Sequence, residues 1–238
     1  MSGTGVLFVL LVISSIPALA VFLWFYFARY PFSPARFSVS LLAGAASFFP
    51  ALLLQNILAP GMGIFQAAGK WGLVISIFLR IAFTEELSRF LVLLVLLIVV
   101  RRLSRAAPDA SATPDGDKGI SPLTIASAIG LVAGLGFAIL ESAVYGASNP
   151  ANALLRAFTA APLHGACGSR VGAAVSMIRE SPVQAVFRFL TAVVIHGIYN
   201  FMLLIPGVLP PIAATLIALS ALGSSIVAIR SGMVERGE

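Results

Sequence analysis

Charged residues are scarce in this sequence. Of its 238 residues, 59% are hydrophobic and only 10% are Asp, Glu, Lys or Arg, whereas a soluble domain carries about 25% charged residues. Several apolar stretches have about 20 residues, the length that a helix needs to cross a bilayer. The scarcity of charge excludes an ordinary soluble domain and predicts a polytopic helical membrane protein.

Cysteine, an N-terminal basic cluster and internal repeats are also scarce or missing. The single Cys167 excludes an intramolecular disulfide and a cysteine zinc cluster. No Lys or Arg precedes the first apolar run, which continues to Ala28, so we interpret the run as a transmembrane helix and not as a cleaved signal peptide. Without a convincing repeat, an inverted-repeat transporter is not supported.

Seven segments are predicted to span the membrane, and most are separated by breaks that contain Pro or Gly. They are Gly5–Ala28, Phe37–Leu58, Gly72–Val100, Pro122–Tyr145, Ala153–Ile178, Gln184–Ile205 and Pro210–Ile229. With the N-terminus outside, ten Lys and Arg residues fall in cytoplasmic segments and two in outer segments. Because this asymmetry agrees with the positive-inside rule, we predict an all-α bundle with a cytoplasmic C-terminus.

The chain is predicted to form a single integral-membrane domain over residues 1–238. Its one long polar segment, residues 101–121, is rich in Ala, Ser, Asp, Pro and Gly, and we interpret it as a flexible cytoplasmic linker. The net charge of +6 comes from basic residues that lie mainly in short loops between spans. Such residues set topology, so no nucleic-acid partner is predicted.

Two glutamates and an arginine lie inside the third predicted span, in "FTEELSRF". Charge within a membrane costs at least about 2.5–3.5 kcal/mol per residue, so each charged residue there requires a reason. At 100° per residue Arg89 falls between Glu85 and Glu86 and can pair with either, whereas Arg80 points to the opposite side. The group is either a buried ion pair that orients helices or, because two adjacent carboxylates do not both ionise easily, a proton-accepting general base.

Polar residues on three further spans are predicted to reach a similar depth. They are Glu141 in "GFAILES", His164 in "HGACG", and His196 and Asn200 in "HGIYN". At about 1.5 Å per helical residue, these residues and Glu85 all lie in the outer half of the bilayer. A single membrane histidine is often a packing residue, but four spans that agree in depth indicate one constellation.

This set of side chains is suited to the activation of water. A glutamate can take a proton from water, and a histidine, alone or with Asn200, can stabilise the oxyanion that forms on an attacked carbonyl. Zinc is the alternative, with His164, His196, Glu85 and Glu141 as ligands. No "HExxH" motif is present. The residues leave the two mechanisms open, with no cofactor as the first expectation and zinc as the second.

The motifs "EELSRF", "GFAILES", "HGACG" and "HGIYN", in this order on successive spans, resemble those of the PrsW family of intramembrane proteases, which is related to the CAAX prenyl endopeptidases. The resemblance implies an endopeptidase embedded in the membrane. Catalysis would rest on four residues and support on three others. The four are Glu85, Glu86, His164 and His196, and the three are Arg89, Glu141 and Asn200. The family usually has Lys at position 89 and Asn at position 142, where this chain has Arg89 and Ser142.

The leading hypothesis is therefore an intramembrane peptide hydrolase that acts on membrane proteins or membrane-anchored peptides near the outer face. A non-catalytic scaffold similar to the Aph-1 subunit of gamma-secretase is the alternative, although a scaffold does not need two carboxylates at one site. Transport ranks last, since the inner halves of the spans offer only Arg170 as a relay group. The resemblance implies a bacterial inner membrane, and the oligomeric state is left open.

Overall fold

The computed structural model describes residues 3–59, 69–106 and 120–234, and within these ranges the chain is helical and has no strand. The helices are α1 (Gly3–Phe27), α2 (Pro34–Leu58), α4 (Gly69–Ile75), the π-helical segment η1 (Ser76–Phe83), α5 (Thr84–Ala106), α6 (Pro122–Gly146), α7 (Pro150–Met177), α8 (Pro182–Leu203) and α9 (Leu209–Val234). The predicted all-α fold is confirmed. The third predicted span corresponds to α4, η1 and α5 in succession.

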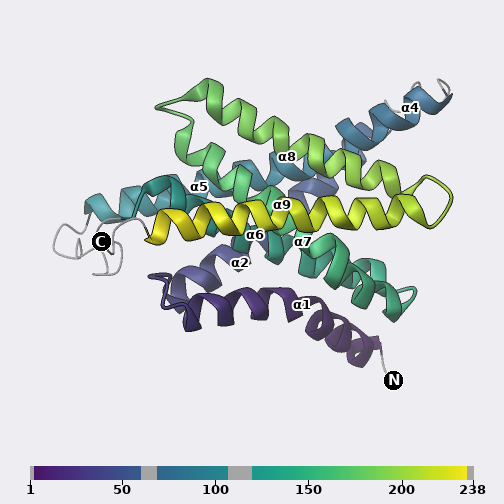
Figure 1. Ribbon diagram of the computed structural model, residues 1–238, viewed down its shortest axis with the longest axis horizontal. Helices are drawn as coiled ribbons and strands as arrows, with labels where there is room; N and C mark the ends of the chain where they lie inside the picture. Colours follow the sequence, from purple (N-terminus) through teal and green to yellow (C-terminus); the bar gives the residue numbers. More distant parts are fainter. Residues whose placement is uncertain (1–2, 60–68, 107–119, 235–238) are drawn as a thin grey trace.

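Five of these helices, α1, α2, α6, α8 and α9, are long and apolar enough to cross a membrane. Among the described residues, α5 and α7 do not meet this criterion, and these two helices carry half of the buried polar side chains. Helix α1 begins at one end of the bundle and α9 ends at the other, as an odd number of crossings requires (Figure 1). The chain is thus a multi-pass membrane protein, and the side on which each end lies stays a prediction from charge.

Four of the described helices, α2, α6, α7 and α8, begin at a proline. Proline suits the first helical position because its missing N–H has no partner there in any case. Ser33, Ser121 and Asn149 precede such prolines, and each side chain accepts a hydrogen bond from a backbone N–H of the first turn. The breaks that the sequence predicted from proline and glycine therefore lie at helix starts. Each of these four helices begins at the first residue of its predicted span or up to three residues before it.

Helices α6 and α7 form the centre of the bundle and pack closely through glycines. A Cβ atom built on Gly130 or Gly134 of α6 would collide with backbone atoms of α7, and one on Gly168 or Gly172 would collide with α6. Small residues let two membrane helices approach in this way. The contact places the middle of α6 directly against the middle of α7, with Gly134 beside the backbone of His164.

The π-helical segment η1 precedes the two glutamates directly. Its wider turns depart from the 100° periodicity, and among the described residues Arg80 makes no hydrogen bond or ion pair with the paired glutamates. The Arg80 Nε donates to the backbone oxygen of Gln55 at 3.2 Å, and the side chain of the same Gln55 contacts Glu85. The ring of Phe78 lies against Gly197, next to His196 on α8.

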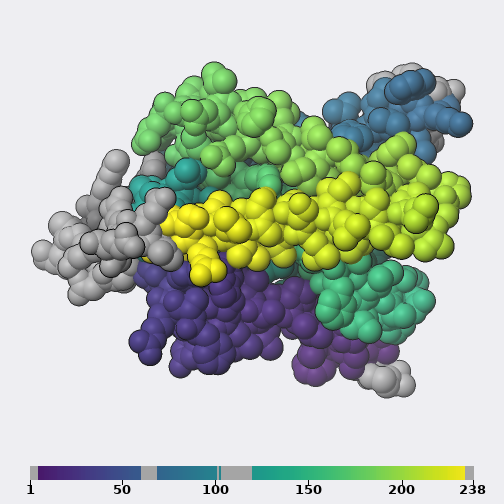
Figure 2. Space-filling view, viewed as in Figure 1, coloured from purple at the N-terminus to yellow at the C-terminus, as the bar shows by residue number. Residues whose placement is uncertain are grey.

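The remaining helices surround this centre. Figure 1 shows α9 along the front of the bundle with α6 behind it, α1 and α2 on one side and α8 on the other. In the space-filling view α4 projects from one end (Figure 2). Large apolar side chains such as Phe8, Phe187 and Val227 are exposed, which is the pattern of a lipid-facing surface. Residues 101–106 of the predicted linker continue α5, and residues 107–119 lie outside the described residues.

Candidate active site in the membrane core

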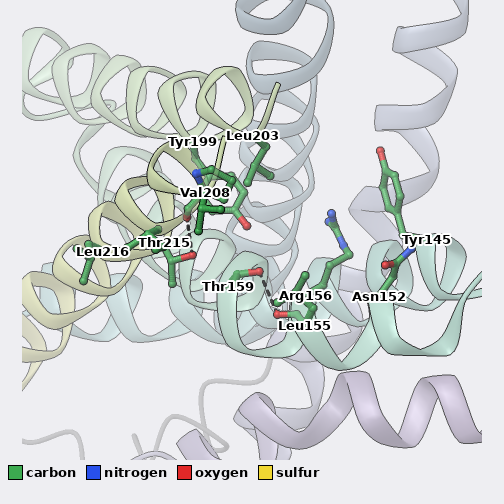
Figure 3. A pocket seen from close by; sticks show the side chains of 12 residues that line it. Tyr145, Asn152, Leu155, Arg156, Thr159, Tyr199, Leu203, Val208, Thr215 and Leu216 are labelled. Atoms are coloured by element: carbon green, nitrogen blue, oxygen red, sulfur yellow. Dashed lines mark hydrogen bonds between the residues drawn. The ribbon is translucent and has the colours of Figure 1, made fainter. Parts of the chain in front are cut away.

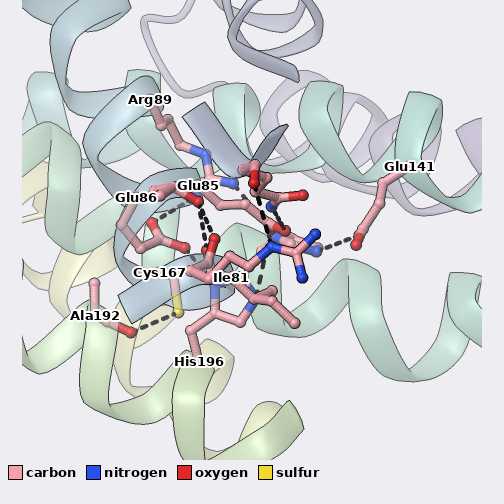
Figure 4. Close-up of polar contacts among 12 residues, drawn as sticks. Ile81, Glu85, Glu86, Arg89, Glu141, Cys167, Ala192 and His196 are labelled. Atoms are coloured by element: carbon pink, nitrogen blue, oxygen red, sulfur yellow. Dashed lines mark hydrogen bonds and ion pairs between the residues drawn. The ribbon is translucent and has the colours of Figure 1, made fainter. Parts of the chain in front are cut away.

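Four helices bring the predicted site residues together in the interior of the bundle. Helix α5 contributes Glu85, Glu86 and Arg89, and α6, α7 and α8 contribute one residue each, namely Glu141, His164 and His196 (Figure 4). Side-chain exposure is 12% for Glu141 and at most 5% for the other five. The residues that the sequence predicted to lie at a similar depth thus also contact one another between the helices.

Glu86 is the carboxylate whose charge is balanced. One of its oxygens forms an ion pair with Nη1 of Arg89, and the other lies 2.7 Å from Nδ1 of His196. A carboxylate that accepts at this distance holds the proton of His196 on Nδ1. Arg89 therefore pairs with Glu86, one of the two partners that the helical wheel allowed, and this pair fixes the ring of His196.

Glu85 differs from its neighbour because one of its oxygens has no partner. The Oε1 atom accepts a hydrogen bond of 3.0 Å from Nε2 of Gln55 on α2. The Oε2 atom is buried without a hydrogen bond, 3.6 Å from Nε2 of His196. A buried carboxylate oxygen without a donor is unusual, since burial of an unsatisfied polar group costs about 1–3 kcal/mol. Glu85 is thus the acceptor that the site leaves open.

His164 links two parts of the cluster through its two ring nitrogens. Its Nδ1 lies 3.3 Å from Nη2 of Arg89, and its Nε2 lies 2.7 Å from Oε2 of Glu141. Because arginine can only donate, Nδ1 accepts and the ring proton resides on Nε2, where it is donated to Glu141. The rings of His164 and His196 lie edge to face with centroids 5.0 Å apart. Arg89 therefore connects Glu86 with His164.

Phe137 of α6 forms an apolar wall beside these charges. The guanidinium of Arg89 lies over its ring, 4.7 Å from the centroid, and the ring centroid of His164 is 5.0 Å away. A charge over an aromatic face is favoured most when water is excluded. The wall keeps the local dielectric low, which strengthens each electrostatic contact in the cluster.

Arg156 joins the cluster to a cavity at one end of the bundle. Its Nη2 contacts the same Glu141 oxygen as His164, at 2.5 Å, and its guanidinium lies over the ring of Tyr145. The cavity, of about 550 Å³, lies between α7, α8 and α9 and is lined mainly by apolar side chains (Figure 3). Arg156 lines it as well. A molecule bound in the cavity would therefore contact Arg156, which also contacts Glu141 of the cluster.

Some residues do not take the place that the sequence suggested. Asn200 shares a helix with His196, but among the described residues it makes no hydrogen bond to the cluster. The hydroxyl of Ser142 is buried without a partner. Gln55 was missed, and the signal for it is an isolated amide near the end of an apolar run, in "LLLQNIL". Cys167 is a buried packing residue whose Sγ contacts the backbone oxygen of Ala192.

Comparison with known proteins places the chain in a family. The sequence profile described as PrsW family intramembrane metalloprotease matches residues 34–224, which contain every residue of the cluster. The chain belongs to the PrsW family. It is thus an intramembrane protease, and the resemblance found in the four motifs is confirmed. Searches of curated proteins and of solved structures gave no match.

The family description implies a metal, and the donor set of this PrsW protein fits one. Ligand atoms of Glu85, His164 and His196 lie within 4.8 Å of one another, and all three residues are buried. Each histidine has a carboxylate on one ring nitrogen, as the ligands of a metal usually do. Both nitrogens of His164 already have protein partners, so a metal would replace Arg89 or Glu141 at one of them. Glu141 lies outside the group of three.

Proposed function

We propose that this PrsW protein hydrolyses peptide bonds of membrane proteins or membrane-anchored peptides, with Glu85 as the group that takes the proton from the attacking water. One observation carries this proposal. Of two adjacent buried glutamates, Glu86 is engaged by Arg89 and His196, whereas Glu85 has a free oxygen facing His196. A base must have a lone pair that is not already occupied, and Glu85 has it.

The other residues would serve the later steps. After Glu85 accepts the proton, the oxygen of the water attacks the carbonyl carbon and negative charge develops on the carbonyl oxygen. His196, whose Nδ1 proton is held by Glu86, would donate from Nε2 to this charge when the ring carries its second proton. When the C–N bond then breaks, the proton taken by Glu85 goes to the leaving amine nitrogen, so that the base is restored. Arg89, Glu141 and His164 hold these groups in place.

A metal-dependent form is the second candidate, and the close grouping of Glu85, His164 and His196 favours it. A zinc ion held by these residues would act as a Lewis acid and make water more acidic. In that form Glu85 is a ligand, and Glu86 and Glu141 orient the two histidines. Both forms require the same buried residues, so the distinction lies in the response to metal.

The substrate is proposed to reach the site from the outer half of the bilayer. The cavity beside Arg156 opens between α7, α8 and α9 and is lined mostly by apolar side chains, which suits a membrane-embedded peptide. We place the protein in a bacterial inner membrane, with the cavity toward the outer side, on the basis of the family and of the charge asymmetry.

The experiment uses purified protein in detergent with a panel of transmembrane peptides. We expect Glu85→Gln to lose at least about 100-fold in kcat, in line with the loss of a general base. The matched control is Glu180→Gln, which removes an exposed carboxylate outside the site and should leave cleavage unchanged. Unchanged cleavage in both Glu85→Gln and Glu86→Gln would contradict the assignment.

Metal analysis of the same samples separates the two forms. Stoichiometric zinc that is lost in His196→Ala, with activity that chelation removes and zinc restores, supports the metal-dependent form. Cleavage that persists after complete chelation but depends on Glu85 supports direct proton transfer to glutamate. Cleavage of no peptide, with or without zinc, would favour the scaffold.

A further inference from the structure

Two arginines line a second cavity that plays no part in the proposed chemistry. Arg170 of α7 and Arg188 of α8 both border a space of about 540 Å³. Its other lining residues are neutral, namely Val183, Gln184, Phe187 and Thr191. The cavity therefore contains two cations and, among its lining residues, no carboxylate.

Arg170 is held in place by neutral acceptors only. Its Nη1 donates to the backbone oxygen of Ala166 at 2.9 Å and to Oγ of Ser225 at 3.0 Å, and its Nη2 donates to Oγ of Ser224 at 2.9 Å. These contacts fix the guanidinium between α7 and α9 without cancelling its charge. Arg170 is thus a rigid, half-buried cation.

Arg188 makes no hydrogen bond or ion pair with any residue in the described part of the chain, and it is half-buried on α8. Arg188 lies in the second turn of α8, which begins at Pro182, so it is about 9 Å along the helix axis from that end. Arginine at this depth reaches toward the headgroups. Charges within a membrane normally pair with an opposite charge or with backbone carbonyls, and two cations that border one cavity without a lining carboxylate favour an anion from outside the chain.

The apolar residues of the cavity indicate what carries that anion. Val183 and Phe187 are 81% and 72% exposed, so they belong to the surface that lipid tails contact. Pro182 follows a turn with Arg179, and the excess of basic residues assigns this end of the bundle to the cytoplasmic side. The cytoplasmic leaflet is the one that carries anionic lipid.

We propose that this cavity binds an anionic phospholipid of the cytoplasmic leaflet. The phosphate lies between Arg170 and Arg188, and an acyl chain runs along Val183 and Phe187. Neither arginine contacts the six buried residues of the active site, so the lipid site stands or falls separately from the proposed catalysis.

The test compares two lipids with identical acyl chains, phosphatidylglycerol and phosphatidylcholine, added to the purified protein in a neutral detergent. Native mass spectrometry counts bound lipid, and thermal unfolding records the shift in Tm. We expect the wild type to prefer phosphatidylglycerol. Arg188→Gln should reduce this preference about fivefold, the effect of one basic residue near anionic lipid. Arg188→Lys, which keeps the charge, should retain most of it.

Arg179→Gln is the matched control because it removes the same charge from the same end of the bundle but does not line this cavity. It should leave the preference unchanged. An equal loss in Arg179→Gln and Arg188→Gln would overturn the proposal in favour of general surface charge. So would a wild type without preference, or inorganic phosphate that raises Tm as much as the lipid does, since a free anion would then suffice.

Discussion

Gln55 donates a hydrogen bond of 3.0 Å from Nε2 to Oε1 of Glu85, across the contact between α2 and α5. This bond orients the carboxyl so that its other oxygen faces His196. Arg80 in turn donates to the backbone oxygen of Gln55, so the backbone that carries this amide is anchored. Positioning of the proposed base therefore depends on a helix that contributes no other residue to the site.

Removal of this amide should impair catalysis more than folding. In Gln55→Leu, Glu85 loses the hydrogen bond that the described residues give it, a contact of about 1–3 kcal/mol, so kcat/KM should fall about fivefold to 150-fold. Asn56→Leu, which changes the exposed neighbouring amide, is the control and should cleave normally. Peptide cleavage and Tm are measured for both variants. Equal activity in the two would show that Gln55 does not position Glu85.

Arg89 should tolerate lysine better than a neutral residue. Arg89→Met leaves Glu86 buried without its cation, and breaking a buried pair in this way costs about 3–5 kcal/mol, so Tm should fall sharply. Arg89→Lys keeps the charge beside Glu86. A single ammonium, however, cannot contact Glu86 and His164 together, as the two nitrogens of the guanidinium do. The Tm of Arg89→Lys should be near that of the wild type while kcat decreases. A stable Arg89→Met variant would contradict this account.

Arg156 should affect turnover through Glu141. Arg156→Gln removes one of the two donors to the Glu141 oxygen that His164 also contacts. The loss of a charge-assisted hydrogen bond of about 1.5 kcal/mol predicts a decrease of about tenfold in kcat/KM. Lys70→Gln removes an exposed cation on the same predicted side and serves as the control. Kinetics that match the control would remove Arg156 from the site.

Asn200 should be dispensable. The sequence placed it with the supporting residues, but its amide does not bond to the described cluster. Asn200→Ala should therefore change kcat/KM by less than about twofold, as for a substitution away from the site. A loss of tenfold or more would indicate that the amide contacts the substrate. Steady-state cleavage of the best peptide from the panel distinguishes the two outcomes.

The close contact between α6 and α7 gives a prediction on stability. A Cβ on Gly168 would collide with the backbone of Gly130, so Gly168→Ala should cost about 1–3 kcal/mol and separate the helices that carry Glu141 and His164. Gly223 of α9 has no atom within 4 Å of such a Cβ. Gly223→Ala should be neutral or stabilising by up to about 1 kcal/mol. Tm of the two variants checks the difference.

The sequence predicted the helical spans and the residues that converge, because apolar length and polar depth depend on position along each helix. It could not predict which partners meet laterally. That Arg89 pairs with Glu86 and reaches His164 depends on how closely α6 and α7 approach, and the contact of Gln55 depends on α2. The link from Arg80 to the backbone of Gln55 could not be predicted either, because it depends on how α2 packs against the π-helical segment.

The π-helical segment η1 also bears on how this chain tolerates changes in length. A π turn holds more residues than an α turn over the same rise, so deletion of one residue within 76–83 would let the segment become α-helical. Every residue of the buried cluster would be retained. The deletion would nevertheless change the direction of Arg80 relative to Glu85, because Arg80 lies within the segment. The number of residues ahead of the paired glutamates is therefore constrained by the direction in which side chains point, as well as by the distance to be spanned.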